Sequence, residues 1–182
     1  MPKCSRHFIM SRYIEKLQFT IDPAPYIKLW SELPVMKQHN LKFREGDEAL
    51  SFEEKLQLGS GSLRNQNILK RQDYTQHIFP EIKKLENQIY EYSNGDLTID
   101  RIRFMNMTPI TCLSYHIDPD PIRYHIPLIT DADAFFVVDD MVERMPEIGR
   151  LYSLPTNVKH TAINASTSAN RLHIVFSTHF NK

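Results

Sequence analysis

The sequence has few of the features that mark secreted, membrane or polyanion-binding proteins. Cys4 and Cys112 are the only cysteines among 182 residues. Two thiols make no disulfide framework, so a reducing cytoplasm is the simplest location. No apolar run reaches the roughly 18 residues of a membrane-spanning helix, and the charged N-terminal segment lacks the apolar centre of a secretory signal. We therefore expect a cytoplasmic protein with no membrane partner.

The chain also lacks an excess of charge of either sign. Lys+Arg and Asp+Glu are both 22, so the formal net charge is zero, which argues against a nucleic acid held by bulk electrostatics. The length and a hydrophobic share of 41% suit one globular domain with a single core. We predict one domain over residues 1–182. Residues 1–95 would form a helical and loop buttress with the substrate mouth, and residues 96–180 would form the core.

The first half of the chain predicts helices and loops. The Asp22-Pro23 step is typical of a helix start and favours a helix over residues 26–33. Ser51 and Glu54 resemble a capping box before a second short helix that ends near Gly59. Residues 59–74 predict a flexible connection. The strongest helical periodicity begins near residues 79–80 and ends at the Asn94-Gly95 pair.

The second half predicts strands. Seven short runs rich in β-branched and aromatic residues are separated by turns containing Pro, Asp, Gly or Ser/Thr. These runs are residues 97–107, 110–117, 123–129, 134–139, 150–154, 158–164 and 171–178. The pattern favours a mainly β fold with N-terminal helices. We expect a double-stranded β-helix, the jelly roll of cupin-like proteins, buttressed by those helices.

One constellation in this half indicates metal chemistry. A strand directs residues i and i+2 to the same face, so His116 and Asp118 would point together. His160, on a distant strand, would complete two imidazoles and a carboxylate, the set that leaves open positions on ferrous iron. Arg171 follows after one turn, and its planar guanidinium suits the far carboxylate of 2-oxoglutarate. We predict His116, Asp118 and His160 as ligands of Fe(II), with 2-oxoglutarate and O₂ as co-substrates.

Each of these side chains also has an ordinary structural interpretation. A single histidine is usually a surface or satisfied core residue, Asp118 could cap the turn before Pro119, and Arg171 could form a surface ion pair. The metal site is absent only if the ordinary interpretation is correct for all four side chains at once. This requirement favours the metal centre. Arg123 and His125 also share a strand face and could line a pocket, but an edge strand in water explains that pair equally well.

Three further side chains share the proposed faces. His173 has the parity of Arg171, and Arg101 and Arg103 alternate on one strand near the proposed mouth. The favoured interpretations are a satisfied barrel histidine for His173 and an exposed strand face for the two arginines.

The stretch from His116 to Ser177 resembles the aspartyl/asparaginyl β-hydroxylase family of 2-oxoglutarate oxygenases. The matching pieces are HIDPDPIRYHIPLIT, GRLYSLPTNVKHTAIN and NRLHIVFS, in that order. The resemblance covers the C-terminal third of the chain, and residues 1–95 show no match. It implies a jelly roll in which His116 and His160 hold iron. Some members carry Gly at the position of Asp118, whereas this chain keeps the carboxylate.

The resemblance also implies roles for the basic residues. Arg171 would hold the distal carboxylate of 2-oxoglutarate, and Arg123 and His125 would contact its other end. The expected activity is hydroxylation of an amino acid, a peptide or a protein side chain, with release of succinate and CO₂. The expected partner is therefore a small-molecule or peptide substrate, with specificity in residues 34–78 and in the loops near Pro119 and Asp140.

Two other classes of function remain open on the sequence. A cupin-like metal protein could bind or isomerise a small ligand without 2-oxoglutarate, and such sites often use more histidines and no late arginine. A metal other than iron, with no affinity for 2-oxoglutarate, would select that alternative. A non-enzymatic binding domain could also keep the fold, although the complete set of ligands speaks against it.

Overall fold

The computed structural model describes residues 13–32, 66–70 and 80–180. The helix expected after Ser51 and most of the segment expected to set specificity, residues 34–65 and 71–78, lie outside these ranges. In the described ranges no helix is long and apolar enough to cross a membrane. The division into a buttress and a core at residue 95 stays a prediction.

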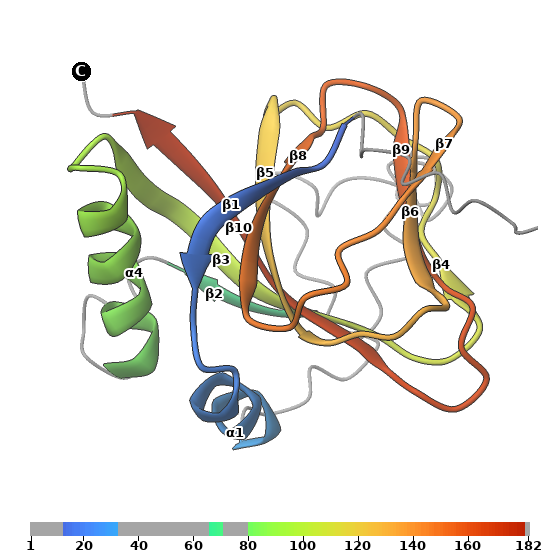
Figure 1. The fold of residues 1–182 in the computed structure, drawn as a ribbon, viewed down its shortest axis with the longest axis horizontal. Helices are drawn as coiled ribbons and strands as arrows, with labels where there is room; N and C mark the ends of the chain where they lie inside the picture. The colour runs from blue at the N-terminus through green and yellow to red at the C-terminus, as the bar shows by residue number, and fades with distance from the viewer. Residues whose placement is uncertain (1–12, 33–65, 71–79, 181–182) are drawn as a thin grey trace, which may run out of the picture.

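Eight strands form a jelly roll made of two antiparallel sheets (Figure 1). The chain alternates between the sheets at almost every step, so that β3, β5, β8 and β10 lie in the larger sheet and β4, β6, β7 and β9 in the smaller one. The strands are β3 (Leu97–Met107), β4 (Thr111–Cys112), β5 (Ile122–Ile129), β6 (Ala134–Val138), β7 (Met141–Glu143), β8 (Arg150–Pro155), β9 (His160–Asn164) and β10 (Arg171–Phe180). The predicted fold class is confirmed.

Two strands from the N-terminal half extend the larger sheet at its edges, giving the order β1-β8-β5-β10-β3-β2. They are β1 (Glu15–Thr20), paired with β8, and β2 (Gln66–Lys70), paired with β3. Neither was expected from the sequence, and β2 shows that the prediction of a flexible connection over residues 59–74 is wrong for its central part. The short strand β7, which forms a hairpin with β6, was also not predicted.

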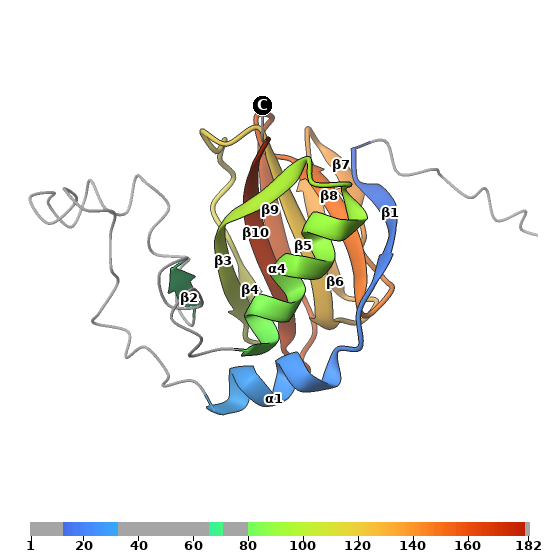
Figure 2. The same ribbon diagram turned by 90° about the vertical axis from the view of Figure 1, so that its left-hand side faces the viewer.

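In Figure 2, one helix, α4 (Pro80–Tyr92), crosses the outer face of the larger sheet, and a second, α1 (Ala24–Glu32), lies below it at the ends of the strands. In α1, the Asp22 side chain accepts a hydrogen bond from the Ala24 N–H at 3.1 Å, which caps the first turn. The helix expected over residues 26–33 is present but begins two residues earlier. The other helix, α4, ends where Gly95 adopts a φ of 87° and its N–H bonds the Tyr90 carbonyl at 2.8 Å.

The larger sheet separates two apolar clusters. On its outer side, alternate residues of β3, β5 and β10 pack against Ile82, Leu85 and Ile89 of α4. Each fully buried Leu or Ile contributes about 1.5–3 kcal/mol to stability. A second cluster, which includes Phe136 and Met107, fills the space between the two sheets. Since side chains alternate along a strand, the same strands that build the outer core also direct residues into the barrel.

Candidate metal centre

His116 and His160 are joined through their backbones. The His116 N–H donates to the His160 carbonyl at 3.0 Å, and the His160 N–H donates to the His116 carbonyl at 2.9 Å. His116 makes this bridge alone, because the strand expected over residues 110–117 is confined to Thr111–Cys112. The reciprocal pair nevertheless aligns the two residues as neighbouring strands would, and the ring centroids lie 4.6 Å apart.

The two imidazoles are oriented in the same way. Nδ1 of His116 lies 2.7 Å from the Ser114 carbonyl oxygen, and Nδ1 of His160 lies 3.0 Å from the Val158 carbonyl oxygen. A carbonyl only accepts hydrogen bonds, so each Nδ1 carries the proton and each Nε2 presents a lone pair. This arrangement is typical of metal-binding histidines, whose second nitrogen donates to a carbonyl or carboxylate.

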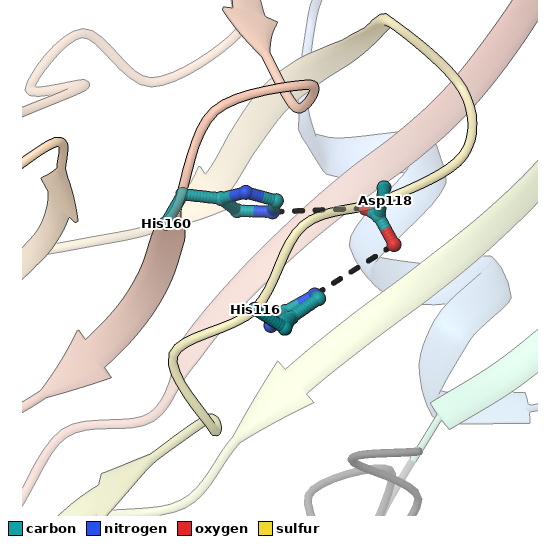
Figure 3. Close-up of side chains that lie close together, drawn as sticks. All are labelled: His116, Asp118 and His160. Atoms are coloured by element: carbon teal, nitrogen blue, oxygen red, sulfur yellow. Dashed lines mark ion pairs between the residues drawn. The ribbon is translucent and has the colours of Figure 1, made fainter.

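Asp118 completes the cluster beside the two rings and contacts both (Figure 3). Its Oδ1 lies 3.7 Å from His116 Nε2, and its Oδ2 lies 3.6 Å from His160 Nε2. One nitrogen or oxygen atom from each of the three residues lies within 4.8 Å of the others. The backbone N–H of Asp118 donates to the Thr156 carbonyl at 2.8 Å, which anchors the residue beyond the bridge. The three donors are therefore close enough to bind one ion.

The environment keeps the Asp118 carboxyl ionised. Burial by itself raises its pKa, but the neighbouring rings of His160 and His116 and the charge of Arg103 together outweigh burial and lower the pKa. Exposure differs between the two histidines, since the side chain of His116 is 34% exposed and that of His160 only 7%. The cluster is therefore open to solvent on the side of His116.

Arg123 and His125 lie on the inner face of a central strand. β5 is paired on both sides, with β8 and with β10, and both residues are buried. The alternative of an edge strand with its polar face in water is therefore wrong. Arg123 Nε lies 3.0 Å from Asp118 Oδ2, so β5 places a positively charged side chain beside the cluster.

Arg171 is almost completely buried, with 1% of its surface exposed. Its Nη1 donates to Met107 Sδ at 3.4 Å, its Nη2 lies 3.3 Å from His173 Nδ1, and its guanidinium lies 4.5 Å above the Phe136 ring. Among the residues that the structure describes, no carboxylate forms an ion pair with it. The alternative of a surface ion pair is therefore wrong.

An isolated buried cation is unfavourable unless an anion accompanies it. Burial lowers the pKa of Arg171 to about 9, so the guanidinium is still charged at neutral pH. The neighbours that the structure describes around the side chain are soft and polarisable, and none of them carries a compensating negative charge. The arrangement fits an anionic ligand that enters the barrel.

Two buried histidines connect Arg171 with the cluster. Three of their ring nitrogens have no hydrogen-bond partner among the described residues: both nitrogens of His125 and the Nε2 of His173. Their ring centroids are 5.8 Å apart, and both rings contact Phe136. Burial, and then the charge of Arg171, lower the pKa of both imidazoles well below 6.5, so both are neutral. Unpartnered polar atoms of this kind suit an oxygen-rich ligand.

The residues around Arg171 were only partly predictable. Met107 and Phe136 contact it from β3 and β6 but are ordinary strand residues in the sequence. His173 shares the parity of Arg171 and was interpreted as a satisfied barrel histidine, although its Nε2 has no partner within the described residues. Arg103 is half-buried rather than on an exposed strand face, and the side chain of Arg101 lies outside the described part.

Comparisons with known proteins agree with this geometry. A family model described as Aspartyl/Asparaginyl beta-hydroxylase matches residues 27–179, well beyond the C-terminal third that carried the sequence resemblance. No curated protein matches the chain. Among solved structures, the viral collagen prolyl hydroxylase vCPH from Paramecium Bursaria Chlorella virus-1, in a 2OG complex, has a TM-score of 0.58 at 10% identity, covering 92% of this chain and 96% of that one.

Two further solved structures are similar. AviO1 from Streptomyces viridochromogenes Tue57 has a TM-score of 0.54 at 15% identity, with 92% of this chain and 89% of that chain covered. A 2OG-Fe(II) oxygenase family oxidoreductase from Burkholderia pseudomallei has a TM-score of 0.41 at 17% identity. That match covers 52% of this chain and 49%, about half, of the Burkholderia chain. At these identities the likeness to vCPH and AviO1 shows the fold.

The family match runs from α1 into the last strand and so includes both histidines, Asp118 and Arg171. It confirms the expected class of enzyme, a 2-oxoglutarate-dependent hydroxylase. The chain belongs to the aspartyl/asparaginyl β-hydroxylase family.

Proposed function

We propose that the protein is an Fe(II)- and 2-oxoglutarate-dependent dioxygenase that hydroxylates an amino acid, a peptide or a protein side chain. One observation carries the proposal. Three metal-ligand side chains and a buried arginine without a carboxylate partner among the described residues lie on the inner surface of one jelly roll. Dioxygen would be consumed, and succinate and CO₂ would be released with the hydroxylated product.

His116, Asp118 and His160 would hold the iron. Their donors suit Fe(II), and three protein ligands on one side leave positions for a keto acid and for dioxygen. Both Nε2 lone pairs are presented by hydrogen bonds at Nδ1, and the carboxyl is ionised, so the ligands are in their binding forms before a metal arrives. When bound, the iron supplies the activation of dioxygen, which no side chain can provide.

Arg171 would bind the distal carboxylate of 2-oxoglutarate. Its guanidinium can donate to both carboxylate oxygens in parallel, and the anion would compensate a buried charge that no described carboxylate pairs with. The neutral ring of His125 would contact the other end of the co-substrate, whereas the guanidinium of Arg123 faces Asp118. Phe136 and Met107 would keep water from the bound acid, which strengthens the electrostatic contacts inside the barrel.

The primary substrate would approach from the exposed side of His116. There Tyr115 and Asp140 hold each other: the Tyr115 hydroxyl donates to Asp140 Oδ1 at 3.1 Å, and the Asp140 N–H donates to Tyr115 Oη at 3.1 Å. This contact ties the turn between β6 and β7 to the segment that carries His116. It supports the proposal that the loops near Pro119 and Asp140 select the substrate.

The test is succinate formation from 2-oxoglutarate by the Fe(II)-loaded protein, measured across a panel of amino acids and peptides. A thermal-shift screen of the same panel with Mn(II) and 2-oxoglutarate would find the ligand without turnover. A panel member should both raise the melting temperature and stimulate succinate release. If the Mn(II)-loaded protein has no affinity for 2-oxoglutarate, the proposal is wrong and the cupin-like alternative is favoured.

A further inference from the structure

Arg123 contacts two carboxylates with two different nitrogens. Its Nε lies 3.0 Å from Asp118 Oδ2, and its Nη2 lies 3.8 Å from Asp120 Oδ2. The Asp118 side chain is 14% exposed and that of Asp120 is 41% exposed, so the first contact is the buried one. We propose that Arg123 is a positioning residue that orients Asp118 toward the metal, an inference that rests on the proposed iron site.

The Asp118 carboxylate needs such an orienting partner. It lies beyond the isolated bridge of His116, directly before Pro119, and no strand that the structure describes includes it. Its backbone is held by the bond to the Thr156 carbonyl, but this bond does not set the rotation of the side chain. Arg123 faces Oδ2, whereas Oδ1 faces His116. Pairing at one oxygen fixes the direction of the other.

The segment that joins the two residues is itself held in place. Thr156, which is fully buried, donates from its N–H to the Pro121 carbonyl at 2.9 Å and from its hydroxyl to the Asp120 carbonyl at 2.5 Å. Together with the Asp118 N–H bond, Thr156 anchors the turn between Asp118 and Arg123 at three points. The guanidinium and the carboxylate therefore meet on a fixed frame.

This role differs from the contact with 2-oxoglutarate that the family resemblance implies for Arg123. Some family members have Gly in place of Asp118, and there the arginine has no such carboxylate to orient. In this chain two of its nitrogens face acids, and its N–H at Nε is not aligned for a hydrogen bond despite the short distance to Asp118.

Two effects of Arg123 on metal affinity oppose each other. The guanidinium repels a divalent cation, which weakens binding, while orientation of the ligand strengthens it. Partners that orient metal ligands typically change metal affinity by about 10- to 100-fold. The proposal requires the gain in affinity from orienting Asp118 to exceed the loss from charge repulsion. Removal of the guanidinium must therefore weaken metal binding.

The experiment measures Mn(II) affinity of the full chain by electron paramagnetic resonance of the free ion, without 2-oxoglutarate. Arg123→Gln should weaken Mn(II) binding about 10- to 100-fold. Arg123→Lys should retain most of the affinity, because one cationic donor suffices at Oδ2.

Arg150→Gln is the matched control, since its guanidinium pairs with Glu147 at 3.2 Å rather than with a metal ligand, and it should leave Mn(II) affinity unchanged. Thermal melting of each variant without metal reports folding, and Arg123→Lys is the decisive variant if Arg123→Gln does not fold.

A double-mutant cycle with Asp118→Gly identifies the group through which Arg123 acts. When Asp118 is already Gly, Arg123→Gln should cause no further loss of Mn(II) affinity. The inference is overturned if Arg123→Gln lowers Mn(II) affinity equally in the Asp118→Gly background. It is also overturned if Arg123→Gln alone binds Mn(II) as tightly as the wild type. A variant that keeps Mn(II) affinity but loses 2-oxoglutarate affinity overturns it as well, since Arg123 would then be a co-substrate ligand. A wild-type protein that binds no Mn(II) would instead refute the proposed function itself.

Discussion

Arg171 carries a positive charge in the interior of the jelly roll, between Met107, His173 and Phe136. Without a ligand this charge opposes folding, because its hydration is lost and none of the described carboxylates pairs with it. The residue is therefore placed for binding at the expense of stability, a common compromise at functional sites.

Replacing Arg171 with Met should separate these two effects. The ligand-free variant should unfold at the same temperature as the wild type or at a higher one, because a buried charge that no described carboxylate pairs with is replaced by an apolar chain of similar length. Its affinity for 2-oxoglutarate, measured by calorimetry with Mn(II) bound, should fall at least about 100-fold, which corresponds to roughly 2.7 kcal/mol. Unchanged 2-oxoglutarate affinity would show that Arg171 is not the anchor.

The buried histidines predict a pH dependence of stability. The pKa values of His125 and His173 are lowered in the folded state by burial and then by Arg171, so below pH 6.5 the unfolded chain takes up protons that the folded chain does not. Stability should therefore fall as the pH drops below 6.5, by up to about 1.4 kcal/mol per pH unit for each histidine.

Urea unfolding of the metal-free protein between pH 7 and pH 5 would measure this slope. His125→Gln should reduce it, since one of the two groups no longer titrates. A slope that is the same in the variant would mean that other groups govern stability in this range.

At the scale of elements, the segment before β8 depends on one glycine. Gly149 has a φ of 77°, its N–H donates to the Pro127 carbonyl at 2.7 Å, and its carbonyl accepts from the Ile21 N–H at 2.9 Å. These bonds connect β1, β5 and β8 just before β8 begins. A Cβ at this position would lie 2.3 Å from the Ile21 carbonyl oxygen, a backbone atom.

Gly149→Ala should therefore be strongly destabilising, by about 2–5 kcal/mol from the left-handed backbone and the steric overlap combined. Gly95→Ala is the matched comparison, because Gly95 also has a positive φ but its added Cβ would meet only the movable Tyr90 side chain at 3.1 Å. It should lose about 1–2 kcal/mol. Equal losses in urea unfolding would show that the contact with Ile21 is not the cause.

The strands show what a sequence can predict. Runs of β-branched and aromatic residues in β3, β5, β6 and β10 were located to within a residue or two, because one face of each packs in a core. The edge strands β1 and β2 were missed, since their positions depend on pairing with distant strands. The expected strand over residues 110–117 is mostly irregular. Ile110 has a φ of 55°, yet the bridge to His160 still directs His116 as a strand would.

The clustering of the three candidate metal ligands was predictable for the same reason that the fold was. HxD, a distant histidine and a later arginine have spacings that a jelly roll brings together, and the structure places His116, Asp118 and His160 in one cluster with Arg123 beside it. The sequence could not reveal that Arg123 faces Asp118, because that contact depends on the turn held by Thr156. It could not reveal the contact of Phe136 with Arg171 either, since β6 and β10 lie in different sheets.

At the scale of the whole molecule, metal and co-substrate should stabilise the fold together. The proposed ligands of both come from four places in the chain, so binding links β5, β9, β10 and the segment of His116. A ligand at 100 times its dissociation constant adds about 2.7 kcal/mol to stability. For a chain of this size that raises the melting temperature by roughly 5–10 °C.

Thermal melts with Mn(II), with 2-oxoglutarate and with both would test this coupling. The increase from 2-oxoglutarate should be larger when Mn(II) is present, because part of the co-substrate would bind the metal. An increase that is independent of Mn(II) would place 2-oxoglutarate elsewhere or on Arg171 alone. His160→Ala should abolish the Mn(II) effect and serves as the control.

The reciprocal backbone pair between His116 and His160 should keep the proposed metal site formed when the iron is lost. Peptide groups, rather than the ion, hold the two imidazoles side by side, so an iron atom lost after a failed turnover would cost activity without dismantling the barrel. The emptied enzyme would keep its ligands in register and could be recharged by fresh ferrous iron. For the same reason it would be open to poisoning by whichever divalent metal arrives first, and the supply of iron in the cell would then govern how much of the protein is active.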